Sequence, residues 1–125
     1  MLAQMLAVAA GGALGAVMRW GVASTVQRLT GGAFPWGTFA VNALGSLLLG
    51  FLFVWFIERS AVGEWMRLAL TVGFLGAFTT FSTYSLESVR LIQEGALAMA
   101  LANVLGQVLV CLSLTWLGVQ LARTL

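Results

Sequence analysis

The sequence predicts an all-α membrane protein in which four transmembrane helices form a single domain over residues 1–125. Hydrophobic residues make up 61% of the chain and charged residues only 8%, and the mean hydropathy is +1.02. Soluble domains carry about 25% charged residues, so this composition excludes them. A transmembrane helix needs about 20 apolar residues. Four stretches of that kind fill the chain, at residues 2–26, 35–57, 66–92 and 96–122.

The first predicted helix, residues 2–26, begins without a basic segment and contains Arg19, so we do not interpret it as a removable signal sequence. Small residues recur along it at helical spacing: Gly11, Gly12, Gly15 and Ala16. A small-xxx-small pattern lets another helix backbone come close. The first helix is therefore expected to pack tightly against a neighbour.

The second and fourth helices each carry a polar stripe at four-residue steps, which places its members on one helix face. In the second helix the stripe is Thr38, Asn42, Ser46 and Gly50, and in the fourth it is Asn103, Gln107, Cys111 and Thr115. Each stripe alone fits hydrogen bonding between helices as well as a solvated path. Together with an interrupted third helix, the two stripes favour a path, which must be narrow or lie between subunits because four helices cannot enclose a wide pore.

The third helix contains a hydroxyl and aromatic insert, residues 79–85, with the sequence Thr-Thr-Phe-Ser-Thr-Tyr-Ser. The backbone freedom of Gly73 and Gly76 and the β-branched threonines predict a break in mid-membrane. A break frees carbonyl groups, which must find a donor or a cation because lipid offers no water. Phe81 and Tyr84 would share a helix face, either as packing residues or as ring edges that contact an anion.

The charged and reactive residues exclude several classes of protein. Cys111 is the only cysteine and there is no histidine, so an intramolecular disulfide is impossible and the usual zinc and iron ligands are missing. The six arginines are spread singly, which does not suggest a nucleic-acid partner. We do not expect an enzyme.

The distribution of arginines over the predicted loops gives almost no orientation signal. Arg59, Arg67 and Arg123 fall on one side of the membrane, against Arg28 and Arg90 on the other. Basic residues normally mark the cytoplasmic side. So small a difference predicts insertion in both orientations and antiparallel pairing of two copies. The alternative is that charge counting does not apply to so small a chain.

Several motifs resemble the CrcB/Fluc family of fluoride channels, and the likeness runs from end to end. They are Gly-Ala-Val-Met-Arg-Trp at 15–20, Gly37-Thr38 with Asn42 four residues after the threonine, and Gly-Phe-Leu-Gly-Ala-Phe-Thr-Thr-Phe-Ser-Thr-Tyr-Ser at 73–85 with Glu87. The resemblance implies an antiparallel dual-topology homodimer in the cell (inner) membrane. It also implies two pores, a structural sodium ion at the dimer centre, and passive export of fluoride that confers fluoride resistance.

The resemblance also assigns roles to residues. The fluoride pathway that it implies consists of Phe81, Tyr84, Asn42, Thr38, Ser82, Thr83, Glu87 and Arg19. In this assignment Phe81 and Tyr84 line the pores, Glu87 is the vestibule acid, and Arg19 stands near the pore entrance. The remaining four residues supply polar groups along the path.

The sodium ligands implied by the resemblance are the backbone carbonyls of Gly76 and Thr79, given by both subunits. Three departures from the family pattern affect the transfer. Tyr84 stands where many members have phenylalanine, and Ala77 replaces a glycine often found in the break. In the fourth helix, Gln107 and Cys111 occupy positions where serines can occur.

Two other functions are compatible with a chain of this size. A small multidrug-type transporter would also have four helices and antiparallel pairing, but it needs a membrane-embedded carboxylate in its first helix. Residues 2–26 contain no aspartate or glutamate. A structural membrane subunit, whose polar stripes only join helices, is the other alternative.

Overall fold

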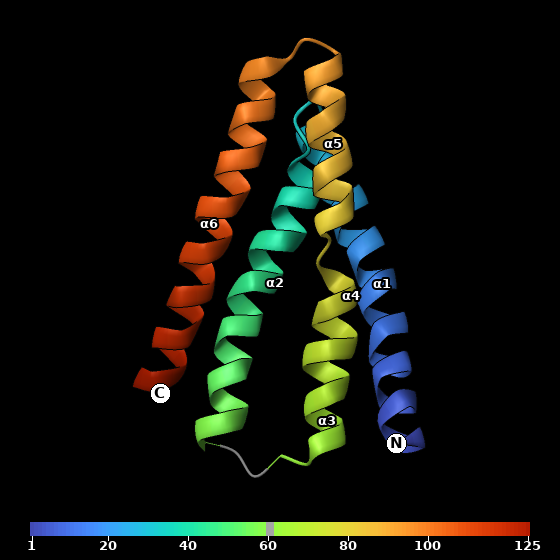
Figure 1. Ribbon diagram of the computed structural model, residues 1–125, viewed down its shortest axis with the longest axis vertical. Coiled ribbons are helices and arrows are strands. Elements are labelled where there is room, and N and C mark those ends of the chain that lie inside the picture. The colour runs from blue at the N-terminus through green and yellow to red at the C-terminus, as the bar shows by residue number, and fades with distance from the viewer. Residues whose placement is uncertain (60–61) are drawn as a thin grey trace.

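The computed structural model describes residues 1–59 and 62–125, without the side chain of Arg59, and consists of four helical legs (Figure 1). The helices, in chain order, are α1 (Leu2–Thr30), α2 (Trp36–Val54), η1 (Trp55–Arg59), α3 (Glu64–Leu68), η2 (Ala69–Leu75), α4 (Gly76–Phe78), α5 (Phe81–Gln93) and α6 (Leu97–Thr124). The segments η1 and η2 are π-helical continuations of their neighbours. No strand occurs in the described part of the chain.

The helices group into four legs: α1; α2 with η1; α3, η2, α4 and α5 as the third leg; and α6. Among the described residues, three legs are long and apolar enough to cross a membrane, namely α1, α2 with most of η1, and α6. The third leg does not form one continuous span because Thr79 and Thr80 separate α4 from α5. The expected all-helical membrane fold with an interrupted third helix is therefore confirmed. Both chain ends lie at the same end of the molecule, as four crossings require (Figure 1).

The turns between legs explain where the helices end. Gly31 and Gly32 follow α1 with φ of 63° and 75°, and Gly95 separates α5 from α6 with φ of 76°. Glycine adopts this left-handed conformation without the steric cost that a Cβ brings. The first helix therefore continues beyond the predicted residue 26, up to Thr30, and stops where the glycines begin.

The two halves of the third leg pack against different helices. Below the break, η2 and α4 lie against α1, whereas α5 lies mainly against α6 above it. A Cβ added to Gly11 or Gly15 would overlap the carbonyl oxygen of Ala69 or Phe74, respectively. The small residues of the first helix thus permit the close packing that was predicted, and their neighbour belongs to the same chain.

The break itself is made by extended backbone. Thr79 has φ −88° and ψ 161°, and Thr80 has φ −153° and ψ 115°. β-Branched residues adopt this conformation readily. Gly76 is helical, with φ −62° and ψ −34°, so the expectation that glycine freedom produces the break is wrong. Gly73 instead allows the close approach of α1, since a Cβ there would come within 2.7 Å of the carbonyl oxygen of Val8.

Candidate functional site

Asn42 of α2 holds the extended residue Thr80 by two hydrogen bonds. The backbone amide of Thr80 donates to Asn42 Oδ1 at 2.7 Å, and Asn42 Nδ2 donates to the carbonyl oxygen of Thr80 at 3.0 Å. Buried backbone groups need such partners when a helix is interrupted. The side chain of Asn42 therefore replaces the helical partners that Thr80 lacks.

The same rearrangement releases the carbonyl groups of residues 76–79, among them those of Gly76 and Thr79. In a continuous helix, the amide of Thr80 would bond to the carbonyl of Gly76, and the amide of Thr83 to that of Thr79. Here the Thr80 amide donates to Asn42, and the Thr83 amide donates to Thr80 Oγ1 at 3.2 Å as an N-cap of α5. Gly76 and Thr79 thus lose their helical donors, which leaves oxygen atoms of the kind that can hold a cation.

An inner cavity of about 360 Å³ lies beside the break. Its lining includes Asn42, Thr79, Phe81, Tyr84, Gln107 and Cys111. The rings of Phe81 and Tyr84 lie 5.3 Å apart at an angle of 46°, so they do share a face. Phe81 is 77% exposed and projects from the chain, whereas Tyr84 is only 8% exposed.

The hydroxyl of Tyr84 bonds to protein. It donates to the carbonyl oxygen of Val104 at 3.0 Å and so connects α5 to α6. In this structure the hydroxyl that distinguishes Tyr84 from phenylalanine therefore bonds to a neighbouring helix.

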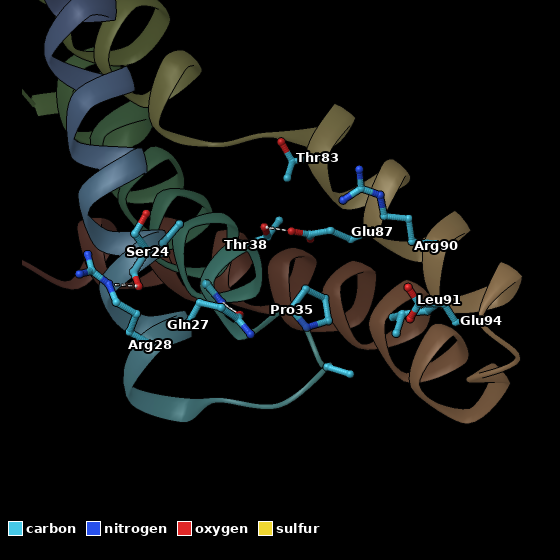
Figure 2. A pocket seen from close by; sticks show the side chains of 13 residues that line it. Ser24, Gln27, Arg28, Pro35, Thr38, Thr83, Glu87, Arg90, Leu91 and Glu94 are labelled. Atoms are coloured by element: carbon cyan, nitrogen blue, oxygen red, sulfur yellow. Dashed lines mark hydrogen bonds between the residues drawn. The ribbon is translucent and has the colours of Figure 1, made fainter.

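An outer cavity of about 540 Å³ opens near the α1–α2 and α5–α6 connections. Thr38 and Glu87 meet across it, and Thr38 Oγ1 donates to Glu87 Oε1 at 2.8 Å (Figure 2). The second carboxylate oxygen of Glu87 is buried without a hydrogen-bond partner among the described residues. Arg28 and Arg90 also line this cavity, as does Glu94, so two basic residues are balanced by two acidic ones.

Gln27 holds the loop that borders the outer cavity, a role that sequence reasoning missed. Its Nε2 donates to the carbonyls of Gly32 and Phe34 at 3.2 and 3.1 Å, and its Oε1 accepts from the amide of Gly37 at 3.1 Å. Only its position one turn before the Gly31-Gly32 pair could have suggested a loop contact.

Of the remaining predicted site residues, Thr83 lines a cavity, whereas Ser82 and Arg19 line neither of the two. Thr83 lines the outer cavity, and its Oγ1 accepts from Thr80 Oγ1 at 3.0 Å. Ser82 is exposed and lies 3.4 Å from the same hydroxyl. Arg19 is half-buried on α1 and lines neither cavity, so the structure does not bring it together with the other predicted residues.

The polar stripes of α2 and α6 meet through amide groups. Asn42 Nδ2 donates to Gln107 Oε1 at 2.8 Å, and Gln107 Nε2 donates to Asn103 Oδ1 at 2.9 Å. Asn103 Nδ2 then donates to Ser88 Oγ at 2.9 Å. The upper parts of the stripes therefore join helices, while Ser46, Cys111 and Thr115 line the inner cavity, and the solvated path stays a prediction. Ser88 was missed by sequence reasoning.

Comparison with known proteins connects this arrangement to a family. Residues 6–119 match the family model described as CrcB-like protein, Camphor Resistance (CrcB). The chain belongs to the CrcB family. This family assignment confirms the resemblance seen in the sequence motifs, and the match covers all four legs, the break and both cavities.

Relatives within the CrcB family match over nearly their whole length. A protein of Citrifermentans bemidjiense is 43% identical over 122 residues, which cover 98% of each chain. One from Magnetococcus marinus is 48% identical over 96% of this chain and 98% of its own, and one from Geobacter sulfurreducens is 46% identical over 97% and 98%. Each is named a fluoride-specific ion channel, FluC. These names describe channels and not enzymes, in agreement with the expectation for this chain.

Proposed function

We propose that this chain is a fluoride-selective channel through which fluoride leaves the cytoplasm passively across the cell (inner) membrane. The observation that carries the proposal is near-complete coverage by relatives named fluoride-specific ion channels. The interrupted helix supports it, because polar side chains and free carbonyls at membrane depth are typical of ion paths. Residues 1–125 would act as one four-helix domain.

The functional unit in this proposal is an antiparallel homodimer with two pores. Phe81 projects from the isolated chain next to the exposed Ser82, so one copy offers aromatic and hydroxyl groups to a second copy. A dual-topology partner would cover these groups and complete two equivalent paths. The weak arginine bias agrees with insertion in both orientations.

A structural sodium ion at the dimer centre fits the donor set. The carbonyls of Gly76 and Thr79 have lost their helical donors, and two copies would supply four such oxygens. No group of three or more His, Cys, Asp or Glu side chains capable of holding a metal exists among the described residues. When bound, sodium would add a fixed positive charge that is weakly screened in the membrane.

Fluoride is tightly hydrated, so a selective path must replace water with several donors. The hydroxyls of Thr38, Ser82 and Thr83 can rotate from one partner to another and can therefore serve an ion in transit. Phe81 and Tyr84 present ring edges, while Glu87 and Arg19 would act near the entrance. Asn42 would position the break beside the path.

Fluoride efflux from liposomes that contain only the purified protein tests this function. A channel releases fluoride down its gradient with no partner protein and no proton gradient, and an ion-selective electrode records the release. A structural subunit would release none, and a multidrug-type transporter would instead move an organic cation in exchange for protons. Chloride efflux under the same conditions measures selectivity.

Phe81→Ile is expected to lower fluoride efflux by roughly tenfold or more, because it removes ring-edge contacts with the anion. The ring is mostly exposed on one chain, so the fold should be kept. Phe53→Ile is the matched control, since Phe53 is also exposed, at 57%, and lines neither cavity. Normal efflux from a correctly assembled Phe81→Ile dimer would remove this ring from the pathway.

Tyr84→Phe is expected to keep efflux within roughly threefold of wild type, because it deletes only one hydrogen bond to a carbonyl. The carbonyl of Val104 lies inside α6, where a helical amide is its regular donor. The melting temperature in detergent should fall slightly, as expected for the loss of a contact between α5 and α6. An inactive but folded variant would show that the hydroxyl serves the ion directly.

A further inference from the structure

The hydrogen bonds between Asn42 and Ser88 run in one direction, and the direction is set at the break. A backbone amide can only donate, so the Thr80 amide requires Asn42 to present Oδ1. Asn42 Nδ2 must then face Gln107 Oε1, which turns Gln107 Nε2 toward Asn103 Oδ1. Each side-chain amide thereby fixes the orientation of the next one.

The series ends on the helix that begins at the break. Asn103 Nδ2 donates to Ser88 Oγ, and Ser88 Oγ donates to the carbonyl of Tyr84 at 2.8 Å. Thr80 is the N-cap of α5, and Tyr84 and Ser88 lie one and two steps of four residues further along this helix. The network therefore connects Thr80 to Ser88 through side chains of α2 and α6.

Asn42 has no spare donor in this arrangement. Its two N–H groups bond to the carbonyl of Thr80 and to Gln107 Oε1, which are all the donors that an amide has. Gln107 is 3% exposed and Asn103 is fully buried. In such an environment an unpaired amide is costly, so the Gln107 contact strongly restrains Asn42.

We propose that Gln107 is a positioning residue that holds the side chain of Asn42 in the orientation in which it bonds to Thr80 and so stabilises the break. Asn103 in turn orients Gln107. The inference rests on the proposed function, which supplies the activity that the break serves. Two groups are needed at position 107, an acceptor toward α2 and a donor toward α6, and the glutamine amide carries both. A serine hydroxyl lies two bonds closer to the backbone and would not reach both partners.

Gln107→Met tests the proposal, because it keeps the side-chain length and removes both polar contacts. Fluoride efflux should fall roughly tenfold, as a buried hydrogen-bond partner is lost. Gln120→Met is the matched control on the same helix, since Gln120 is half-buried and has no side-chain hydrogen bond within the described chain. In an Asn42→Ala background, Gln107→Met should cause no further loss.

Hydrogen exchange of the Thr80 amide gives a readout that does not depend on conduction. Gln107→Met should exchange this amide roughly tenfold faster than wild type, because Asn42 no longer stays fixed as its acceptor. If wild-type liposomes release no fluoride but the exchange still accelerates, the positioning role stands and the proposed function fails. Unchanged exchange, or losses that add up in the double variant, would overturn the positioning role.

Asn103→Leu provides a second route to the same test if Gln107→Met does not assemble. It leaves the Asn42–Gln107 contact in place and removes the bond that orients Gln107 Nε2, together with the bond from Asn103 Nδ2 to Ser88 Oγ. Faster exchange at Thr80 with a smaller loss of efflux is the expected result. Normal exchange in an assembled Asn103→Leu dimer would contradict the proposal.

Discussion

Asn42→Asp is expected to reduce fluoride efflux by roughly a hundredfold or more, because it removes two donors and adds a charge that repels the anion. The carboxylate could still accept from the Thr80 amide. Its other oxygen, however, would face the carbonyl of Thr80 and Gln107 Oε1, which lie 3.0 and 2.8 Å from the present amide nitrogen. The release is measured from liposomes with an ion-selective electrode.

Asn42→Leu separates the two causes of that loss. Leucine has a similar volume and neither donates nor carries a charge, so its effect reports the lost hydrogen bonds alone. The aspartate variant should be the more defective of the two if charge repulsion contributes. Size-exclusion chromatography verifies that each variant remains assembled. An assembled Asn42→Asp dimer with normal efflux would show that this part of α2 does not border the path.

The second large effect concerns membrane orientation. A tag after Leu125 should be found on both sides of the membrane in comparable amounts, since three arginines on one side are opposed by two on the other. Adding about three lysines at the C-terminus should hold that end in the cytoplasm and abolish efflux. The reason is that the proposed sodium site and both pores need an antiparallel partner.

Co-expression provides the control for the orientation experiment. A second copy biased in the opposite orientation should restore efflux, because each variant then finds its antiparallel partner. The matched addition of about three glutamines at the C-terminus should leave the wild-type distribution and efflux unchanged. Full efflux from a wild-type protein whose tags all lie on one face would contradict the dual-topology proposal, and with it the shared carbonyls of Gly76 and Thr79.

The sequence alone determined the class of the protein and the position of its interruption. Hydropathy is a property of successive residues, so the four apolar stretches appeared in the structure as four helical legs, with ends shifted by a few residues. The hydroxyl-rich insert marked the break correctly. Of the two predicted causes, the β-branched threonines form the extended residues of the break, Thr79 and Thr80, whereas glycine freedom does not contribute because Gly76 is helical.

Only the tertiary structure decided which polar groups meet. Asn42 and Gln107 are 65 residues apart in the chain, and a stripe on each helix does not say which faces come together. Packing of α2 against α6 brought the stripes into contact, and the donor-only amide of Thr80 then fixed the orientation of each side-chain amide in turn. Likewise, the hydroxyl of Tyr84 bonds to the carbonyl of Val104 because α5 packs against α6. Periodicity gives the face on which a side chain lies, whereas its hydrogen-bond partner depends on how the helices pack.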